Sequence, residues 1–284
     1  MTVLEVIQKS SEFLAKKGVD SPRLQTELLL AHLLKLPRMK LYLNFERVLS
    51  PAELDALRAL VMRRSQREPL QHIVGSTSFC GLEMFVNKAV LVPRPETELL
   101  AEMSWQFLST LASQPTTALD FGTGSGCIAI ALAVKCPTVR ITAIDVSDDS
   151  LAIAKQNAAA NKVSELIEFR CGNGFATLNS GDKFDLIVSN PPYIASEEIA
   201  TLQPEVRDFD PRGALDGGAD GLDFYRSLAY ESAAFLKLAG KLMVEFGDDQ
   251  AEAISAIFSS KRWHVEGVHE DYSKRPRILV VKRS

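Results

Sequence analysis

Apolar residues repeat at helical spacing over residues 1 to 68, with polar positions between them. The repeat is carried by Val3, Ile7, Phe13, Leu14, Leu24, Leu28, Leu29 and Leu33. Ser50, followed by Pro51 and Glu53, is typical of a helix start, with a capping hydroxyl, a proline in the first turn and an early acid. These patterns predict a small helical-bundle domain over residues 1–68.

The stretch from residue 69 to residue 95 has a different pattern. Short β-prone runs are separated by Gly75 and Gly81, and they cover residues 71–74, 83–86 and 89–92. Glycine between such runs favours turns. We therefore expect a β-hairpin linker over residues 69–95.

From residue 96 to residue 284, apolar runs of strand length alternate with helical patterns. Strands are predicted at residues 117–121, 139–145, 167–171, 184–189, 241–246, 263–269 and 277–281. Helices are predicted between the first five, among them residues 127–135, 150–161 and 221–238, the last with Gly240 just past its end. Such alternation predicts an α/β fold, in which helices cover both faces of a parallel sheet. The last two strands are joined without a helix, so that pair should be antiparallel.

Composition narrows the class of protein and its surroundings. Apolar residues make up 46% of the 284 residues and charged residues 24%, which is ordinary for a globular protein. The first residues carry no signal-peptide pattern, and no apolar run approaches the roughly 20 residues that span a bilayer. A cytoplasmic location without membrane association is therefore expected. The cysteines and histidines are scattered along the chain and form no cluster with the spacing of metal ligands, so no metal is expected. The net charge of −4 argues against a broad surface that binds nucleic acid.

A glycine-rich loop follows the first strand of the α/β region. It reads Asp120, Phe121, Gly122, Thr123, Gly124, Ser125, Gly126. Glycines at a strand-to-helix turn let the backbone approach a nucleotide-type cofactor, and the next helix offers its N–H groups. The third glycine comes one residue earlier than in the dinucleotide pattern, which disfavours NAD. Asp145 ends the next strand, where an acid can accept hydrogen bonds from both hydroxyls of a ribose, and Asp120 can face a cationic amine. A turn flanked by two solvated aspartates is the alternative.

A second motif follows the fourth strand of the same region and reads Asn190, Pro191, Pro192, Tyr193. The Asn190 side-chain oxygen and the Pro191 carbonyl can each accept one N–H of a planar –NH₂ group, while the two prolines stiffen the loop. Tyr193 can stack on that flat group. Beside the cofactor loop, such a clamp indicates methyl transfer to an amide or an exocyclic amine. A turn that ends the strand, with Tyr193 in the core, is the plainer alternative.

Three further motifs make the chain similar to a known family. They are residues 93–98 (PRPETE), 217–222 (GGADGL) and 245–247 (EFG). With the glycine loop and residues 190–193, they resemble the peptide chain release factor glutamine methyltransferases, the PrmC/HemK family of class I S-adenosylmethionine-dependent methyltransferases. The resemblance covers nearly the whole chain, including the helical domain.

The resemblance implies a fold and a reaction. The fold is a Rossmann-like class I methyltransferase sheet of seven strands, the last of them reversed, over residues 96–284. The reaction is transfer of a methyl group from S-adenosylmethionine to the side-chain amide nitrogen, N5, of the glutamine in a release factor's Gly-Gly-Gln loop. The helical domain would recognise the release factor, and the enzyme is expected to act as a monomer that does not bind nucleic acid directly.

The resemblance also implies roles for individual residues. The loop from Gly122 to Gly126 would hold the methionine part of the cofactor and Asp145 its ribose, with Asn190 bordering the cofactor as well as the acceptor. Residues 171–175 would border the adenine. Asn173 stands where many class I enzymes carry Asp, and Gly174 where some relatives have a large aromatic side chain, so Phe175 is expected to supply the apolar contact.

Two other functions fit parts of the pattern. An adenine-N6 methyltransferase acting on DNA or RNA would use the same clamp on a flipped base, but it needs a basic surface, and the basic residues of the helical domain are offset by acids. A non-catalytic adaptor on this fold typically loses the glycines or the clamp, and both are present. Residues 93–98 are open to two interpretations, a helix start with acids in its first turn or part of the active-site lining.

Overall fold

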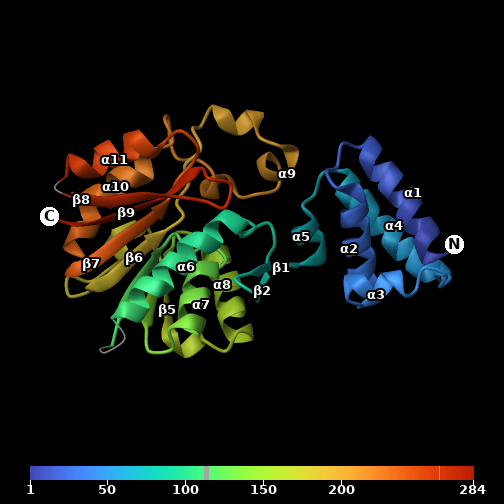
Figure 1. Cartoon of the computed structure of the whole chain (residues 1–284), viewed down its shortest axis with the longest axis horizontal. Helices are drawn as coiled ribbons and strands as arrows, with labels where there is room; N and C mark the ends of the chain where they lie inside the picture. The colour runs from blue at the N-terminus through green and yellow to red at the C-terminus, as the bar shows by residue number, and fades with distance from the viewer. Residues whose placement is uncertain (112–114, 262) are drawn as a thin grey trace. The chain divides into compact units, whose positions relative to one another are not determined.

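The computed structural model of the chain describes residues 1–111, 115–261 and 263–284. It contains two compact units, which are both visible in Figure 1. The helical unit comprises Met1–Ser76 and Gln203–Phe209, and the sheet unit comprises Thr77–Leu202 and Asp210–Ser284. The expected boundaries at residues 68 and 95 differ from this division, because the hairpin falls almost wholly in the sheet unit and a short later segment falls in the helical unit.

The helical unit is built from short helices around an aliphatic core. Its helices are α1 (Val3–Lys16), α2 (Pro22–Leu34), α3 (Arg38–Tyr42), α4 (Pro51–Ser65), α5 (Leu70–Val74) and α9 (Pro204–Arg207). Thr2 caps α1 and Ser50 caps α4, each in a reciprocal capping box with a glutamate three residues later. The predicted start of α4 is thereby confirmed, with Pro51 in its first turn. The core holds Val3, Ile7, Leu14, Leu29, Leu30, Leu41, Leu57 and Val61.

Residues 71–74 form part of helix α5, so the prediction of a strand there is wrong. The helix begins after Pro69, ends at Gly75 in a left-handed conformation, and places Ile73 in the core of the helical unit. Five residues are too few to display a helical period, and β-branched side chains then dominate the local pattern. Tertiary packing decides the structure of this segment.

Helix α9 joins the helical unit through ion pairs. Glu205 contacts Arg64 Nη2 at 2.7 Å and both Nε and Nη2 of Arg67 at 2.6 Å. Arg64 is 3% exposed, so its charge needs a nearby partner. The segment that carries Glu205 follows the Asn190–Tyr193 motif in the sequence by about a dozen residues, yet it belongs to the same compact unit as the N-terminal helices.

The sheet unit contains seven strands in the order β5-β4-β3-β6-β7-β9-β8. They are β3 (Thr117–Phe121), β4 (Arg140–Asp145), β5 (Ile167–Cys171), β6 (Phe184–Ser189), β7 (Leu236–Glu245), β8 (Trp263–Glu270) and β9 (Pro276–Arg283). The strands from β5 to β7 are parallel, and β9 runs antiparallel to both β7 and β8. The predicted α/β fold and the antiparallel final pair are confirmed. The strand order reverses at β3, which pairs with β4 on one side and β6 on the other.

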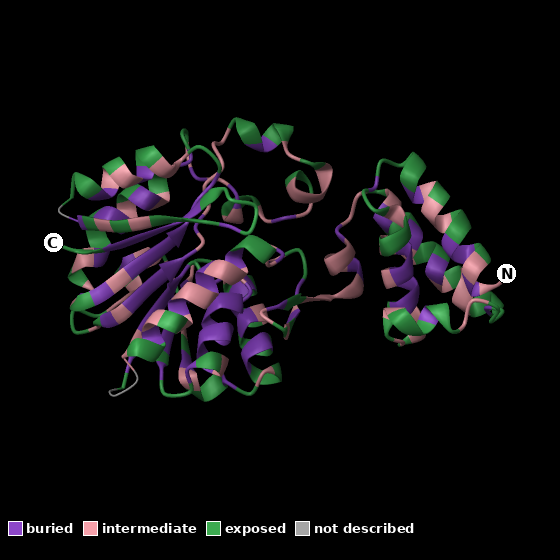
Figure 2. Ribbon diagram, in the orientation of Figure 1, coloured by how far each residue is buried: buried purple, intermediate pink, exposed green. Residues whose placement is uncertain are grey.

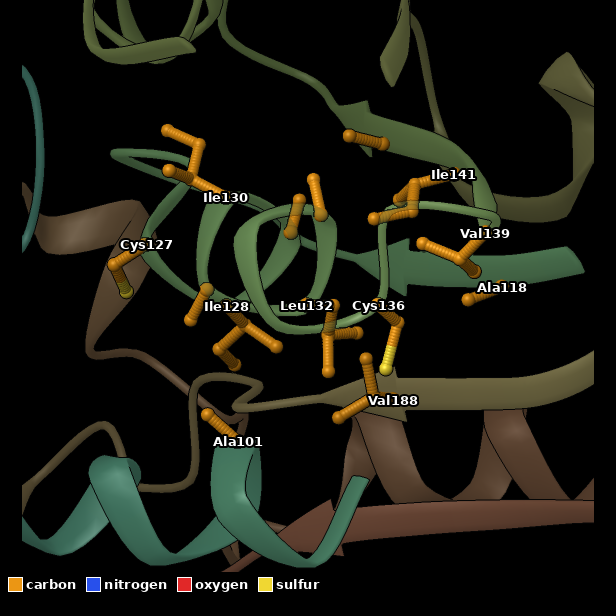
Figure 3. Packing of buried hydrophobic residues seen from close by; sticks show 14 of the residues in the cluster. Ala101, Ala118, Cys127, Ile128, Ile130, Leu132, Cys136, Val139, Ile141 and Val188 are labelled. Atoms are coloured by element: carbon orange, nitrogen blue, oxygen red, sulfur yellow. The ribbon is translucent and has the colours of Figure 1, made fainter. Parts of the chain in front are cut away.

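Helices cover both faces of this sheet, as Figures 1 and 2 show. One face packs against α6 (Pro95–Thr110), α7 (Cys127–Lys135) and α8 (Asp148–Ala160), and the other against α10 (Asp223–Glu231) and α11 (Ala251–Ser259). Figure 3 shows the first core close up, with Ile128 and Leu132 of α7 lying near Ala101 of α6 and Val188 of β6. The strands between these layers are buried on both faces, which accounts for their continuous apolar runs.

A hairpin of β1 (Ser76–Phe79) and β2 (Leu82–Phe85) packs against α8. The buried Asn157 amide of α8 accepts a hydrogen bond from the Phe85 N–H at 2.7 Å and donates one to the Phe85 carbonyl at 3.0 Å. The hairpin is therefore tied to the sheet unit. The strand expected at residues 89–92 is absent, since that segment forms a turn and an irregular stretch.

The helix predicted at residues 221–238 is too long. Helix α10 ends at Glu231, a short 3-10 helix covers Ser232–Ala234, and β7 has begun by Leu236. Gly240 lies inside β7 where its register against β6 shifts, and a Cβ on it would lie 2.9 Å from the Asp185 carbonyl oxygen. This glycine therefore marks an irregularity in a strand and not the end of a helix. Other 3-10 helices are Ser164–Leu166, Gly174–Thr177, Glu198–Thr201 and Arg212–Ala214.

Candidate active site

The glycine loop lies at the carboxyl end of β3, where the strand order reverses. Gly122, Gly124 and Gly126 all have left-handed backbone conformations, with φ of 73°, 54° and 81°. The loop is fixed to the next strand because the Gly122 and Thr123 N–H groups both donate to the Ile144 carbonyl, at 3.0 and 2.9 Å. In open α/β sheets, ligands bind at this position.

The three glycines have different surroundings. A Cβ added to Gly122 or Gly124 would meet no atom within 4 Å, so there is open space beside both. A Cβ on Gly126 would lie 3.1 Å from Ala154 of α8 and 3.1 Å from Ile130 of α7. The first two glycines therefore leave room for a ligand against the backbone, and the third allows the two helices to approach closely.

Asp120 is a buried carboxylate with one unpaired oxygen. Its Oδ2 accepts hydrogen bonds from the Thr123 hydroxyl at 2.7 Å and from the Ala129 N–H at 3.1 Å. Its Oδ1 is buried and has no partner among the described residues. Burial raises the pKa of Asp120 to about 6, against the lowering effect of these hydrogen bonds. A cationic group at Oδ1 would stabilise the ionised form, which fits the amine predicted from the sequence.

Asp145 ends β4 and holds the glycine loop from the other side. Its Oδ2 accepts from the Gly124 N–H at 2.8 Å, and its Oδ1 accepts from the Ser147 N–H at 2.9 Å. Each carboxylate oxygen can accept more than one hydrogen bond, so both can still take a ribose hydroxyl. The side chain is only partly buried.

We expect Asp145→Ala to weaken cofactor binding. The change removes two hydrogen bonds to a charged acceptor, each worth about 1.5–3 kcal/mol, but water that replaces them offsets part of this loss. The dissociation constant should therefore rise roughly 10- to 100-fold. Titration calorimetry with S-adenosylmethionine measures this dissociation constant. Asp149→Ala, which removes an exposed acid four residues later, in the first turn of α8, is the matched control. Equal affinity in the two variants would exclude Asp145 from the binding site.

The end of β5 carries the segment expected to border an adenine. The Gly172 N–H donates to the Asp145 carbonyl at 2.9 Å, which places residues 171–175 beside Asp145. A Cβ on Gly174 would lie 3.3 Å from the Phe121 ring, so that ring takes the space that a large side chain at 174 would need. Phe175 is 4% exposed and packs on Phe121 and Phe235. A contact of Asn173 or Phe175 with adenine stays a prediction.

Asn190 follows β6 and is held by the start of α6. Its Nδ2 donates to the Thr97 hydroxyl oxygen at 2.9 Å. Its Oδ1 makes no hydrogen bond with the described residues, and the Pro191 carbonyl likewise accepts none from them. The two oxygens that the sequence assigned to an acceptor –NH₂ group are therefore available. Thr97 was not predicted as a site residue, although it lies within the PRPETE motif.

Three glycines pack against the loop that follows Asn190. An added Cβ would lie 2.9 Å from the Pro192 carbonyl oxygen at Gly217, 2.3 Å from the Tyr193 carbonyl oxygen at Gly221, and 2.9 Å from the Tyr193 ring at Gly247. These glycines come from the GGADGL and EFG motifs, whose purpose the sequence did not reveal. Both motifs serve to bring backbone against the Asn-Pro-Pro-Tyr loop.

Gln250 is a further support of this loop that the sequence did not indicate. Its Nε2 donates to the Tyr193 carbonyl at 2.9 Å, and its Oε1 accepts from the Gly247 N–H at 2.9 Å. No local pattern singles out one glutamine ahead of a helix. Tyr193 itself is half-buried, and burial raises the pKa of its hydroxyl to about 12, so the ring stays neutral.

Residues 93–98 combine the two interpretations that the sequence left open. Pro95 occupies the first turn of α6, with Glu96 and Glu98 as its early acids. The same segment also pairs Arg94 with the buried Asp210 at 2.7 Å and places Thr97 against Asn190. It is a helix start that contacts the acceptor loop.

Two family models match this chain. Residues 5–75 match the PrmC N-terminal domain, and residues 100–205 match the methyltransferase small domain. A release factor glutamine methyltransferase of Geobacter sulfurreducens is 45% identical over 91% of this chain and 88% of its own length. Another from Chlorobaculum tepidum is 43% identical over 98% of this chain and 96% of its own length.

Solved structures share the fold at low sequence identity. A methyltransferase from Pyrococcus furiosus aligns with a TM-score of 0.55 and 19% identity over 78% of this chain and 98% of its own. The hMettl16 catalytic domain in complex with a 3'UTR hairpin aligns with a TM-score of 0.54 and 15% identity over 83% of each chain.

Within the described residues, no helix is long and apolar enough to cross a membrane, and no group of ligand side chains could hold a metal.

Proposed function

Because this chain belongs to the release factor glutamine methyltransferase family, we propose that it methylates the side-chain amide nitrogen of a release factor glutamine by means of Asn190 and its loop. The chain is an S-adenosylmethionine-dependent methyltransferase with a class I fold. The observation that supports the residue assignment is the geometry of Asn190. Its amide N–H is already used by Thr97, which leaves its oxygen for an incoming –NH₂ group.

The residues around the glycine loop fit S-adenosylmethionine. The open space beside Gly122 and Gly124 suits a ligand in contact with the backbone, and the unpaired Asp120 Oδ1 suits an amino group. Asp145 offers two acceptor oxygens at the position of a ribose. When bound, this cofactor supplies a methyl group on a positively charged sulfur, which is an electrophile that needs no metal or redox chemistry.

An amide nitrogen is a weak nucleophile, and residues of this chain compensate for that weakness. Hydrogen bonds from the acceptor –NH₂ to Asn190 Oδ1 and the Pro191 carbonyl fix the direction of the nitrogen lone pair. Both oxygens also stabilise the positive charge that builds on the nitrogen as the new bond forms. The neutral Tyr193 ring borders this loop, and no residue here needs to act as a strong general base.

Adenine methylation is the less favoured function. It is supported by the chemical similarity between an exocyclic amine and an amide. The relatives from Geobacter sulfurreducens and Chlorobaculum tepidum, which match over more than nine tenths of the chain, are instead named release factor glutamine methyltransferases. The structure bound to an RNA hairpin shares the fold alone at 15% identity. We retain the proposals that the enzyme acts as a monomer and does not bind nucleic acid directly.

We further propose that the helical unit recognises the release factor. All the candidate cofactor and acceptor residues lie in the sheet unit, while the helical unit has its own core and exposes Met39 and Leu43 on and just after α3. Both exposed fractions are large, 65% and 77%, and such side chains on a small domain suit contact with another protein.

Removal of residues 1–76 should separate recognition from catalysis. We expect residues 77–284 to bind S-adenosylmethionine as the full chain does, to methylate a short Gly-Gly-Gln peptide at a similar rate, and to methylate intact release factor at least tenfold more slowly, a loss of about 1.4 kcal/mol of interaction. Calorimetry and methyl-transfer rates on both substrates measure these effects. Full activity on the intact release factor would contradict a recognition role for the helical unit.

A further inference from the structure

Glu27 is a buried carboxylate of α2 that binds three polar side chains of the helical unit. Its Oε1 accepts a hydrogen bond from Arg23 Nε at 3.0 Å, and its Oε2 accepts one from Arg38 Nη1 at 3.1 Å. The Tyr42 hydroxyl lies 3.0 and 3.1 Å from the same two oxygens. Glu27 is only 1% exposed, so these partners offset the cost of burying its charge. Neither cofactor binding nor methyl transfer, as proposed above, uses this cluster.

The cluster has more positive charge than its own carboxylate neutralises. Glu27 balances one of the two guanidinium groups, and the other remains in excess. The side chains of Arg23 and Arg38 are 58% and 38% exposed, and their other N–H groups have no hydrogen-bond partner among the described residues. Because Glu27 already holds both guanidinium groups, little side-chain entropy is lost when another acid binds them. The pair is therefore prepared to bind a carboxylate from outside.

The sequence around this cluster is basic. Residues 22–45, which include α2 and α3, contain Arg23, Lys35, Arg38 and Lys40, but Glu27 is their only acid. Four positive charges against one negative charge give this segment a net charge of +3, whereas the whole chain carries −4. A local excess of this sign attracts an acidic partner and orients its approach.

Exposed apolar side chains lie next to the arginine pair. Met39 and Leu43 are 65% and 77% exposed, and their spacing of four positions places them on one side of α3. Figure 2 shows most of α3 in the colour of exposed residues. Among the described residues, seven of the twelve large apolar side chains that are exposed belong to the helical unit, which is less than a third of the chain. Apolar side chains beside charged ones are typical of a protein-binding surface.

We propose that Arg23, Arg38, Met39 and Leu43, together called the α2–α3 surface, bind an acidic and partly apolar surface of the release factor. The proposal rests on the recognition role proposed for the helical unit, and it names the part of that unit which makes the contact. The two arginines bind a carboxylate, while Met39 and Leu43 bury apolar surface beside it. This contact does not involve the glutamine that is methylated, so it raises affinity for the intact release factor and not for a short peptide.

Two other occupants fit the α2–α3 surface less well. Single-stranded RNA is usually bound by basic side chains together with aromatic rings that stack on bases. The Tyr42 hydroxyl is held by Glu27, however, and its ring packs on Phe45 with the ring centroids 5.0 Å apart. Met39 and Leu43 offer no hydrogen bonds to phosphate. A symmetric dimer would place the surface against its own copy, where like charges repel.

Arg38→Gln tests the charged part of the surface. The change removes a positive charge but leaves an amide that can still donate to Glu27. We expect the KM for intact release factor to rise about tenfold, with kcat and the activity on a short Gly-Gly-Gln peptide within about twofold of wild type. Arg58→Gln, which removes an exposed arginine of α4, is the matched control and should behave as wild type. Titration calorimetry with intact release factor measures the loss of affinity without turnover.

Leu43→Asp tests the apolar part of the surface. The side chain is largely exposed, so the fold should tolerate the change, and the new carboxylate would face an acidic partner. We expect the KM for intact release factor to rise about tenfold or more, again without a change on the peptide. Leu238→Asp, the same change at an 84% exposed position of the sheet unit, is the control. The thermal unfolding midpoints of both variants should match that of wild type.

The outcomes separate this proposal from the proposed function. A KM within about twofold of wild type for either Arg38→Gln or Leu43→Asp would overturn the α2–α3 surface while leaving the methylation of release factors intact. Failure of the wild-type chain to methylate any release factor would instead refute the proposed function. Two further results would overturn the proposal by assigning the surface to another occupant. One is loss of affinity for a labelled RNA hairpin in Arg38→Gln with unchanged release factor binding, and the other is a wild-type dimer that Leu43→Asp converts to a monomer in sedimentation.

Discussion

Asn190→Ala should lower the rate of methyl transfer to release factor about 10² to 10³-fold, which is the usual effect of removing one preorganised polar group where charge develops. The affinity for S-adenosylmethionine should change only a few fold, because the bonds assigned to the cofactor come from Asp120, Asp145 and the glycine loop. Single-turnover rates with labelled cofactor and calorimetry measure the two quantities separately.

Asn190→Asp sharpens this prediction because it keeps the size of the side chain and an acceptor oxygen. It also removes the Nδ2 donor to Thr97 and adds a negative charge to the acceptor loop. We therefore expect a slow enzyme that still binds its cofactor. If Asn190 only ends a strand, both variants should methylate at near wild-type rates, and the assigned mechanism would be wrong.

Gly221→Ala should lower kcat about 10²-fold, the effect expected when a reacting group is misplaced by roughly 1 Å. Gly221 has φ of 74°, and a Cβ there would lie 2.3 Å from the Tyr193 carbonyl oxygen and 2.8 Å from Gln250 Nε2. An alanine at this position must therefore displace its neighbours, and the nearest atoms belong to Tyr193 of the acceptor loop and to Gln250, which hydrogen-bonds that loop. Cofactor affinity should be nearly unchanged.

Gly213→Ala is the matched control for this substitution. Gly213 is exposed, its φ is not left-handed, and an added Cβ would meet nothing within 4 Å. We expect wild-type rates and stability from this variant. Similar kcat values for the two alanine variants would show that the approach of Gly221 to Tyr193 does not control the geometry of the acceptor loop.

Most of the sheet unit could be predicted from the sequence because its signals are local. Strands such as β3 and β6 are buried on both faces, so each appears in the sequence as an unbroken apolar run. The candidate site residues follow directly at the ends of these strands. Predictions failed where packing decides the structure. Residues 71–74 are helical because Ile73 fills the helical core, and Gly240 lies in a strand because β6 approaches it closely.

The position of the candidate site was predictable in part for the same reason. The glycine loop, Asp145 and Asn190 lie at the ends of strands, so adjacent residues reveal them. Thr97 and Gln250 reach the acceptor loop from two different parts of the chain, and no spacing in the sequence relates them. Their contribution is visible only as distances, such as the 2.9 Å between Asn190 Nδ2 and Thr97 Oγ1.

The most direct test of the account is methylation of a release factor by the full chain with S-adenosylmethionine labelled in its methyl group. The account predicts that the label enters the wild-type release factor at the Gly-Gly-Gln glutamine, as located by peptide mass spectrometry. It also predicts that the label is lost when that glutamine is replaced by glutamate, and that it does not enter adenine-containing DNA or RNA. Label that persists in the glutamate variant, or that enters adenine in preference to the release factor, would contradict the account.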